Sequence, residues 1–118
     1  MSFYFIGLKM IIRLNEDKIK NEKIYRLDGM YKAIHSAFAQ MNFSRLYDGT
    51  ESMIYHDNGD VYDYAKFGRI VNTLKKKEWF LDNALIWLFC DSDDSDNPED
   101  FNEEDLLYYY KNKKSVVA

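Results

Sequence analysis

The sequence has little of the residues that cross-link or interrupt a chain. Its 118 residues include one cysteine, one proline and five glycines. The single cysteine, Cys90, excludes an internal disulfide bond and a metal site built from several cysteines, and it is typical of a protein from a reducing cytoplasm. The scarcity of proline and glycine excludes collagen-like and linker-rich sequences. We therefore expect one continuous cytoplasmic domain over residues 1–118.

Long hydrophobic runs are also missing. The longest uninterrupted apolar run, residues 84–90, is far shorter than the roughly 20 residues of a membrane-spanning helix. The opening residues, MSFYFI, have no basic residue before their apolar part, which predicts that there is no secretory signal. By contrast, 47% of the residues are hydrophobic, and 8 Phe, 10 Tyr and 2 Trp can fill a core. This composition predicts a folded domain with no membrane partner.

The spacing of apolar residues predicts strands in four places. Residues 3–14, with Gly7 as a candidate bulge, and residues 43–47 and 52–56 are rich in β-branched and aromatic side chains. Asp48-Gly49 favours a hairpin between the last two, and Asn58-Gly59 ends the second of them. Residues 83–90 are too continuously apolar for a surface strand, which indicates a central strand buried on both faces.

Helical spacing of apolar residues predicts two helices that face the core. The first begins after Asp28 as its N-cap and presents Met30, Ile34, Ala37, Phe38 and Met41. The second ends in the lysine triplet 75–77 and presents Tyr64, Phe67, Val71 and Leu74. Residues 15–26 fit a solvated loop or a short helix equally well.

A third helix is predicted near the C-terminus. Asn102 would cap it, Glu103 to Asp105 would occupy its first turn, and Phe101 and Leu106 would form a hydrophobic staple. Leu106, Leu107 and part of the tyrosine triplet 108–110 would pack inward. The resulting fold is α+β, a single compact domain with a mixed sheet of about four strands and about three helices packed on it.

Charge is distributed unevenly along the chain. The net charge is −4, yet residues 91–105 contain nine acids and no lysine or arginine. The rest of the chain therefore has 11 acids against 16 bases and carries +5. Such a block of carboxylates attracts cationic partners and repels nucleic acid, and the basic remainder lacks interleaved arginine and aromatic residues. We expect no direct contact with nucleic acid.

Residues that could carry catalysis are few. His35 and His56 show no spacing that brings them together, and Asp91 beside Cys90 would raise the pKa of the thiol. The glycines form no phosphate-binding loop. Asp91, Asp93 and Ser95 match the start of a calcium loop, but Asp96 stands where the loop needs glycine and Asn102 where it needs glutamate. We expect no catalytic residue, no cofactor and no metal site.

One stretch carries a resemblance to a known family. Residues 84–101, ALIWLFCDSDDSDNPEDF, running into Glu103-Glu104-Asp105-Leu106-Leu107, resemble the C-terminal part of the immunity proteins of bacterial contact-dependent growth inhibition systems (CdiI type). The resemblance covers mainly residues 84–118. It implies a cytoplasmic, non-enzymatic protein that binds and blocks the C-terminal toxin domain of a cell-contact effector, usually a nuclease, as a heterodimer.

The charge pattern favours the same function, because carboxylates can occupy the lysine, arginine and histidine side chains with which a nuclease holds phosphates. The residues expected to bind the partner are Asp91, Asp93, Asp94, Asp96, Glu99, Asp100, Phe101, Glu104, Tyr108 and Tyr109. Two alternatives remain open at this point. One is an acidic nucleic-acid mimic of phage or plasmid origin that blocks a host nuclease, and the other is a metal-dependent hydrolase that uses the acidic loop.

Overall fold

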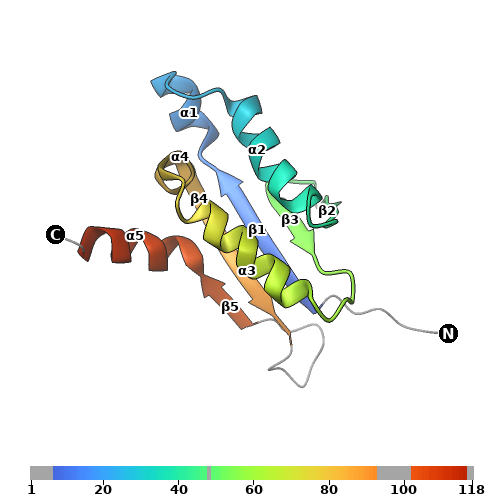
Figure 1. Ribbon diagram of the computed structural model, residues 1–118. Coiled ribbons are helices and arrows are strands. Elements are labelled where there is room, and N and C mark those ends of the chain that lie inside the picture. The colour runs from blue at the N-terminus through green and yellow to red at the C-terminus, as the bar shows by residue number, and fades with distance from the viewer. Residues whose placement is uncertain (1–6, 48, 93–101, 117–118) are drawn as a thin grey trace.

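The framework of the protein is one five-stranded antiparallel sheet, seen in a computed structural model that describes residues 7–47, 49–92 and 102–116 (Figure 1). Its strands, in the order β2-β3-β1-β4-β5 across the sheet, are β1 (Leu8–Leu14), β2 (Arg45–Leu46), β3 (Met53–His56), β4 (Ala84–Asp91) and β5 (Asn102–Asp105). The α+β class is confirmed. The expected mixed sheet of about four strands is instead antiparallel throughout, because β2–β3 and β4–β5 are hairpins and β1 pairs antiparallel with both β3 and β4.

Five helices accompany the described strands, two more than the sequence predicted: α1 (Glu16–Glu22), α2 (Leu27–Ala39), α3 (Asp63–Leu74), α4 (Glu78–Asn83) and α5 (Leu106–Val116). The undecided residues 15–26 form α1, because the Asn15 side chain accepts a hydrogen bond from the Lys18 N–H and Lys23 ends the helix in the left-handed conformation. Within the described residues, no helix has the length and apolar character needed to cross a membrane.

Two helix boundaries differ from the predicted ones. Helix α2 begins at Leu27, so Asp28 lies inside the first turn, where its carboxylate accepts the Gly29 N–H, and it is not the N-cap. Helix α3 ends at Leu74, and Lys75 is its C-cap, so the lysine triplet follows the helix instead of forming its last turn.

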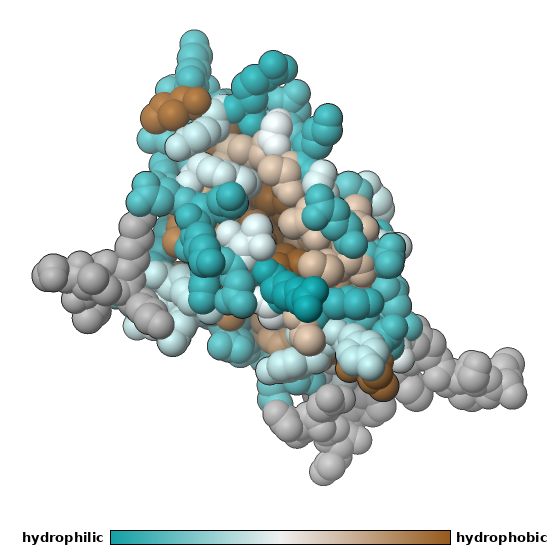
Figure 2. Space-filling model, viewed as in Figure 1, coloured by the Kyte–Doolittle hydropathy of each residue, from teal (hydrophilic) through white to brown (hydrophobic). Residues whose placement is uncertain are grey.

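The hydrophobic core lies between one face of the sheet and the helices. Figure 1 shows α2 and α3 lying across this face, and Figure 2 shows hydrophobic side chains between otherwise hydrophilic helix surfaces. Aromatic rings join the two layers: Phe38 of α2 stacks on Tyr55 of β3 at 3.8 Å, and Phe67 of α3 meets Phe89 of β4 at 5.7 Å. Trp87 of β4 is fully buried, as a core residue should be.

Strand β4 is internal to the sheet, but the prediction that it is buried on both faces is wrong. Leu85 is 54% exposed, and Ile86 and Leu88 are only partly buried. Within the described residues, the aromatic rings of the helices reach β4 on one face, that of Trp87 and Phe89. Gly7 precedes β1, and the irregularity in the β1–β4 register falls between Arg13 and Leu14, so no bulge forms at Gly7.

The predicted hairpin between residues 43–47 and 52–56 is confirmed as β2–β3. Gly49 has φ +84° and Gly59 has φ +77°, a left-handed conformation that glycine adopts without steric cost. The second of these turns leads into the loop before α3, which forms part of the surface described below.

Candidate partner-binding surface

The β4–β5 hairpin brings the two ends of the acidic segment together. Asp91, the last residue of β4, pairs with Asn102, the first residue of β5, and Glu103 and Glu104 follow along the exposed edge strand. The connection falls outside the described residues, and with it lie six of the predicted binding residues: Asp93, Asp94, Asp96, Glu99, Asp100 and Phe101. Asp91 and Glu104, by contrast, are placed on adjacent strands.

The predicted start of the last helix is wrong. Residues 102–105 form a strand, because their backbones are used in the ladder with β4, and α5 begins only at Leu106. Asp105 takes the capping role expected of Asn102, since its Oδ1 accepts the Tyr108 N–H at 3.0 Å. The acids at 103 and 104 therefore line an open sheet edge and do not stabilise a helix end.

A hollow of about 220 Å³ lies between this edge and α3. We call it the edge hollow, and its lining residues are Tyr64, Phe89, Asp91, Asn102, Glu103 and Glu104. The ring of Tyr64 meets the ring of Phe89 edge-on at 5.9 Å, while the tyrosine side chain is 64% exposed. The sequence predicted Tyr64 as a core residue, and the structure corrects this to an exposed aromatic beside three carboxylates.

A second hollow, of about 250 Å³, lies on the other side of Tyr64. This loop hollow is lined by Gly7, Leu8, Asp57, Gly59, Asp60, Val61 and Tyr64. Together the described linings of the two hollows hold five carboxylates and no lysine or arginine. Val61 and Tyr62, at the tip of the loop, are 87% and 68% exposed. The two hollows and this tip form what we call the acidic-aromatic surface.

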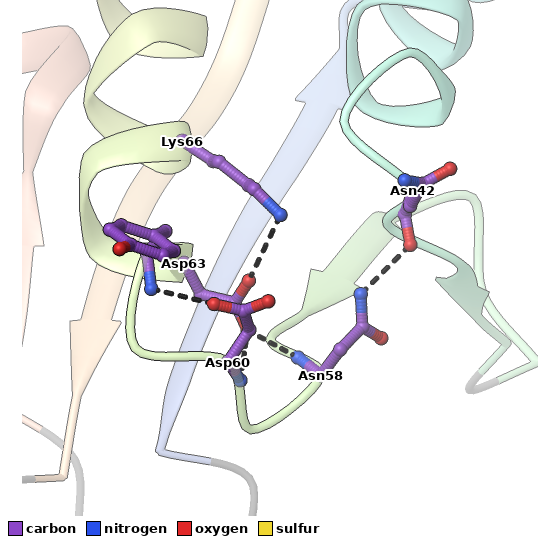
Figure 3. A network of polar contacts seen from close by, with 6 residues as sticks. Asn42, Asn58, Asp60, Asp63 and Lys66 are labelled. Atoms are coloured by element: carbon purple, nitrogen blue, oxygen red, sulfur yellow. Dashed lines mark hydrogen bonds and ion pairs between the residues drawn. The ribbon is translucent and has the colours of Figure 1, made fainter.

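A buried carboxylate holds the loop that carries Val61 and Tyr62 (Figure 3). Asp63, only 1% exposed, accepts the Asn58 N–H at 2.7 Å and the Asp60 N–H at 3.1 Å on its Oδ2. Its Oδ1 lies 3.8 Å from the Lys66 ammonium, and Asp60 in turn accepts the Tyr62 N–H. These bonds fix the loop at the start of α3, so the tip is presented in a defined shape.

Two of the predicted tyrosines are exposed, as expected for residues available to a partner. Tyr108 is 70% and Tyr109 51% exposed on α5, whereas Tyr110 packs on Trp87 at 5.6 Å between ring centroids. Leu106 and Leu107 are buried, which confirms the predicted inward face of this segment. Since α5 follows β5 directly, both exposed tyrosines lie beyond the acidic edge on the same stretch of chain.

The candidate catalytic residues considered in the sequence are Cys90, His35 and His56, and each of them is buried or hydrogen-bonded within the fold. Burial raises the pKa of the Cys90 thiol to about 11, and Glu103 adds to the effect. The imidazole of His35 hydrogen-bonds Tyr55, whose pKa burial raises to about 12, and His56 hydrogen-bonds the Asp57 carbonyl. Across the described residues, no group of three His, Cys, Asp or Glu side chains is placed to hold a metal ion.

Comparison of the chain with protein-family models, with curated proteins and with solved structures gives no match in any of the three. The resemblance to immunity proteins therefore stays a prediction. Sequence reasoning missed Asp60, Val61, Tyr62 and Tyr64, although one signal was present: two aspartates three residues apart after Asn58-Gly59 are typical of a turn that caps a helix.

Proposed function

We propose that the protein is a non-enzymatic inhibitor that binds and neutralises a basic toxin domain, with the nuclease toxin of a contact-dependent growth inhibition system as its cognate target. The observation that carries this proposal is the acidic-aromatic surface. Carboxylates of two strands and a loop surround an exposed aromatic side chain that a fixed network supports.

The charges account for recognition of the partner. A nuclease holds phosphates with lysine, arginine and histidine, so Asp91, Glu103 and Glu104 can occupy those cations in place of the nucleic acid. Arginine pairs bidentately with a carboxylate, which adds geometric selectivity. Attraction between opposite charges also speeds association, which matters for an inhibitor that must act before the toxin turns over.

The aromatic side chains account for tight binding. Interfaces draw most of their binding energy from a few desolvated anchors, among which tyrosine is over-represented. Tyr64 is such an anchor, because its side chain lines both hollows and lies beside their carboxylates. The exposed side chains of Val61 and Tyr62 extend its apolar area. A rigid loop loses little entropy on binding.

Neutralisation of the toxin tests this proposal. The toxin domain encoded by the reading frame immediately upstream is expressed with wild type, with Tyr64→Ala or with Tyr25→Ala. Tyr25 is a matched control, since it is 46% exposed and lines a different hollow beside Trp79. We expect wild type and Tyr25→Ala to co-purify with the toxin and protect the cells, and Tyr64→Ala to lose protection. Equal protection by both variants would overturn the assignment of the surface.

A nuclease of the host is the other target class, and it shares the electrostatics. Purified protein separates the two, because an inhibitor of a cognate toxin leaves unrelated nucleases active. Inhibition of a host nuclease together with no binding of the upstream toxin domain would favour the nucleic-acid mimic.

A further inference from the structure

The loop hollow is lined by side chains of two kinds. Asp57 and Asp60 supply carboxylates, whereas Val61 and Tyr64 supply apolar and aromatic surface that is 87% and 64% exposed. Its volume of about 250 Å³ is small for a pocket that holds a whole organic ligand, and it suits one large side chain. The loop hollow therefore offers negative charge and apolar surface together to a group of that size.

Several backbone N–H groups around the loop hollow are already used within the fold. The Gly7 N–H donates to Oδ1 of Asp57 at 3.1 Å. The N–H groups of Asn58 and Asp60 donate to the buried carboxylate of Asp63, as Figure 3 shows. Because these donors are used, the loop hollow favours a ligand that is cationic and brings its own N–H donors over an anion.

Asp60 supplies the acceptor that such a ligand can reach. Its Oδ1 accepts the Tyr62 N–H at 2.9 Å, and its Oδ2 has no hydrogen-bond partner among the described residues. Asp57, only 8% exposed, adds a second negative charge at a fixed place. The Lys66 ammonium lies 3.8 Å from Asp63 and does not line the hollow. The described lining thus holds two carboxylates and no lysine or arginine.

We propose that the loop hollow binds the guanidinium group of an arginine side chain of the partner protein. The guanidinium donates to Asp60 in its plane and lies with its face on the Tyr64 ring, while Asp57 contributes charge. A guanidinium is planar, weakly hydrated and rich in donors, and it stacks on aromatic rings, whereas a lysine ammonium is a strongly hydrated point charge. The identity of the partner as a toxin rests on the proposed function, and the preference for arginine rests on the lining of the hollow.

Small ligands test the loop hollow without toxin. N-acetyl-arginine methylamide is titrated into isotope-labelled protein, and NMR follows the backbone amide resonances. The lysine and citrulline counterparts are the matched ligands, since citrulline keeps the shape of arginine without its charge. We expect arginine to shift the amides of Gly59, Val61 and Tyr64 saturably, lysine to bind at least about threefold more weakly, and citrulline to give no saturable shift. Equal binding of arginine and lysine, or no shift at these amides, would overturn the proposal.

Two variants of the lining make the test specific. Asp60→Asn removes the charge but keeps an oxygen that can accept the Tyr62 N–H, and Tyr64→Leu removes the aromatic ring. Each should weaken arginine binding at least about threefold. Asp28→Asn is the matched control, because Asp28 is an exposed acid outside the hollow that also accepts a backbone N–H, and it should bind arginine as wild type does.

The dispersion of the amide resonances establishes that each variant is folded, and the two variants of the lining replace each other if one is not. Unchanged arginine binding by a folded variant of the lining would overturn the proposal. Toxin binding is measured separately. A protein that binds the toxin domain but not arginine would overturn the arginine site alone, and one that binds arginine but not the toxin domain would overturn the proposed function alone.

Discussion

Asp105 is the last residue of β5 and also caps α5 through its bond to the Tyr108 N–H. Asp105→Ala leaves that N–H without a side-chain partner, so the free energy of unfolding should fall by about 0.5–2 kcal/mol. Asn102→Ala, on the exposed start of the same strand, is the control and should change it by less than about 0.5 kcal/mol. Urea unfolding followed by tryptophan fluorescence compares the two, and a larger loss for Asn102→Ala would contradict the capping assignment.

Cys90 titrates far from neutrality, because burial raises the pKa of its thiol to about 11. At neutral pH iodoacetamide should therefore label the urea-unfolded chain readily and the native chain very slowly. As pH rises above the free-thiol pKa of about 8.5, the unfolded chain loses a proton that the native chain keeps, so this residue's contribution to stability declines until about pH 11. Cys90→Ala should show a shallower alkaline loss of stability, measured by thermal unfolding against pH. Labelling of the native chain as fast as of the unfolded one would contradict this.

At the residue scale, local patterns could not decide between competing roles. Asn102 and Asp105 are both good capping residues, and only the pairing of 102–105 with β4, a contact made by the fold, selects Asp105. Tyr64 lies three residues before buried Phe67, which is helical spacing, but its ring meets Phe89 only edge-on and the side chain stays 64% exposed. The burial of Phe67, Leu74 and Trp87 was predictable, because their apolar neighbours recur at regular spacing.

At the element scale, the loop before α3 depends on one carboxylate. Asp63→Ala removes the buried carboxylate that accepts the Asn58 and Asp60 N–H groups, and it should lower the free energy of unfolding by about 1–3 kcal/mol. Asp60→Ala removes only the bond to the Tyr62 N–H and should cost less. Urea unfolding of both variants measures the difference. Equal costs would show that the loop does not rest on Asp63.

The exposed acids of β5 have a structural consequence besides binding. An unpaired edge strand is a template for aggregation, and charged side chains on a short strand prevent it. Glu103 and Glu104 are charged residues on such a short edge strand.

The sequence predicted the hairpin turns and the main strands from local composition, but it could not predict β5. Its four polar residues form a strand only because their backbones pair with the edge of β4.

At the scale of the whole molecule, the α+β class followed from alternating patterns of apolar spacing, while the sheet order β2-β3-β1-β4-β5 depends on contacts between distant segments. The acidic block was visible in the sequence. The sequence did not show that this block lies beside the loop that carries Val61 and Tyr62, because the two are far apart in the sequence. Tyr64 of α3 lines both hollows and so connects them. A binding surface assembled from three elements leaves no single motif in the sequence.

The most direct measurement of the central claim is the association rate with the upstream toxin domain as a function of salt. Asp91→Asn with Glu104→Gln removes two charges from the edge hollow at nearly constant size. Asp17→Asn with Glu22→Gln, two exposed acids of α1, is the matched control with the same change in net charge. At low ionic strength, where screening is weak, we expect the first pair to associate several-fold more slowly than wild type and the control to match wild type, with the difference shrinking as salt rises. If the two double variants associate at the same rate at every salt concentration, the acidic-aromatic surface is not where the toxin binds.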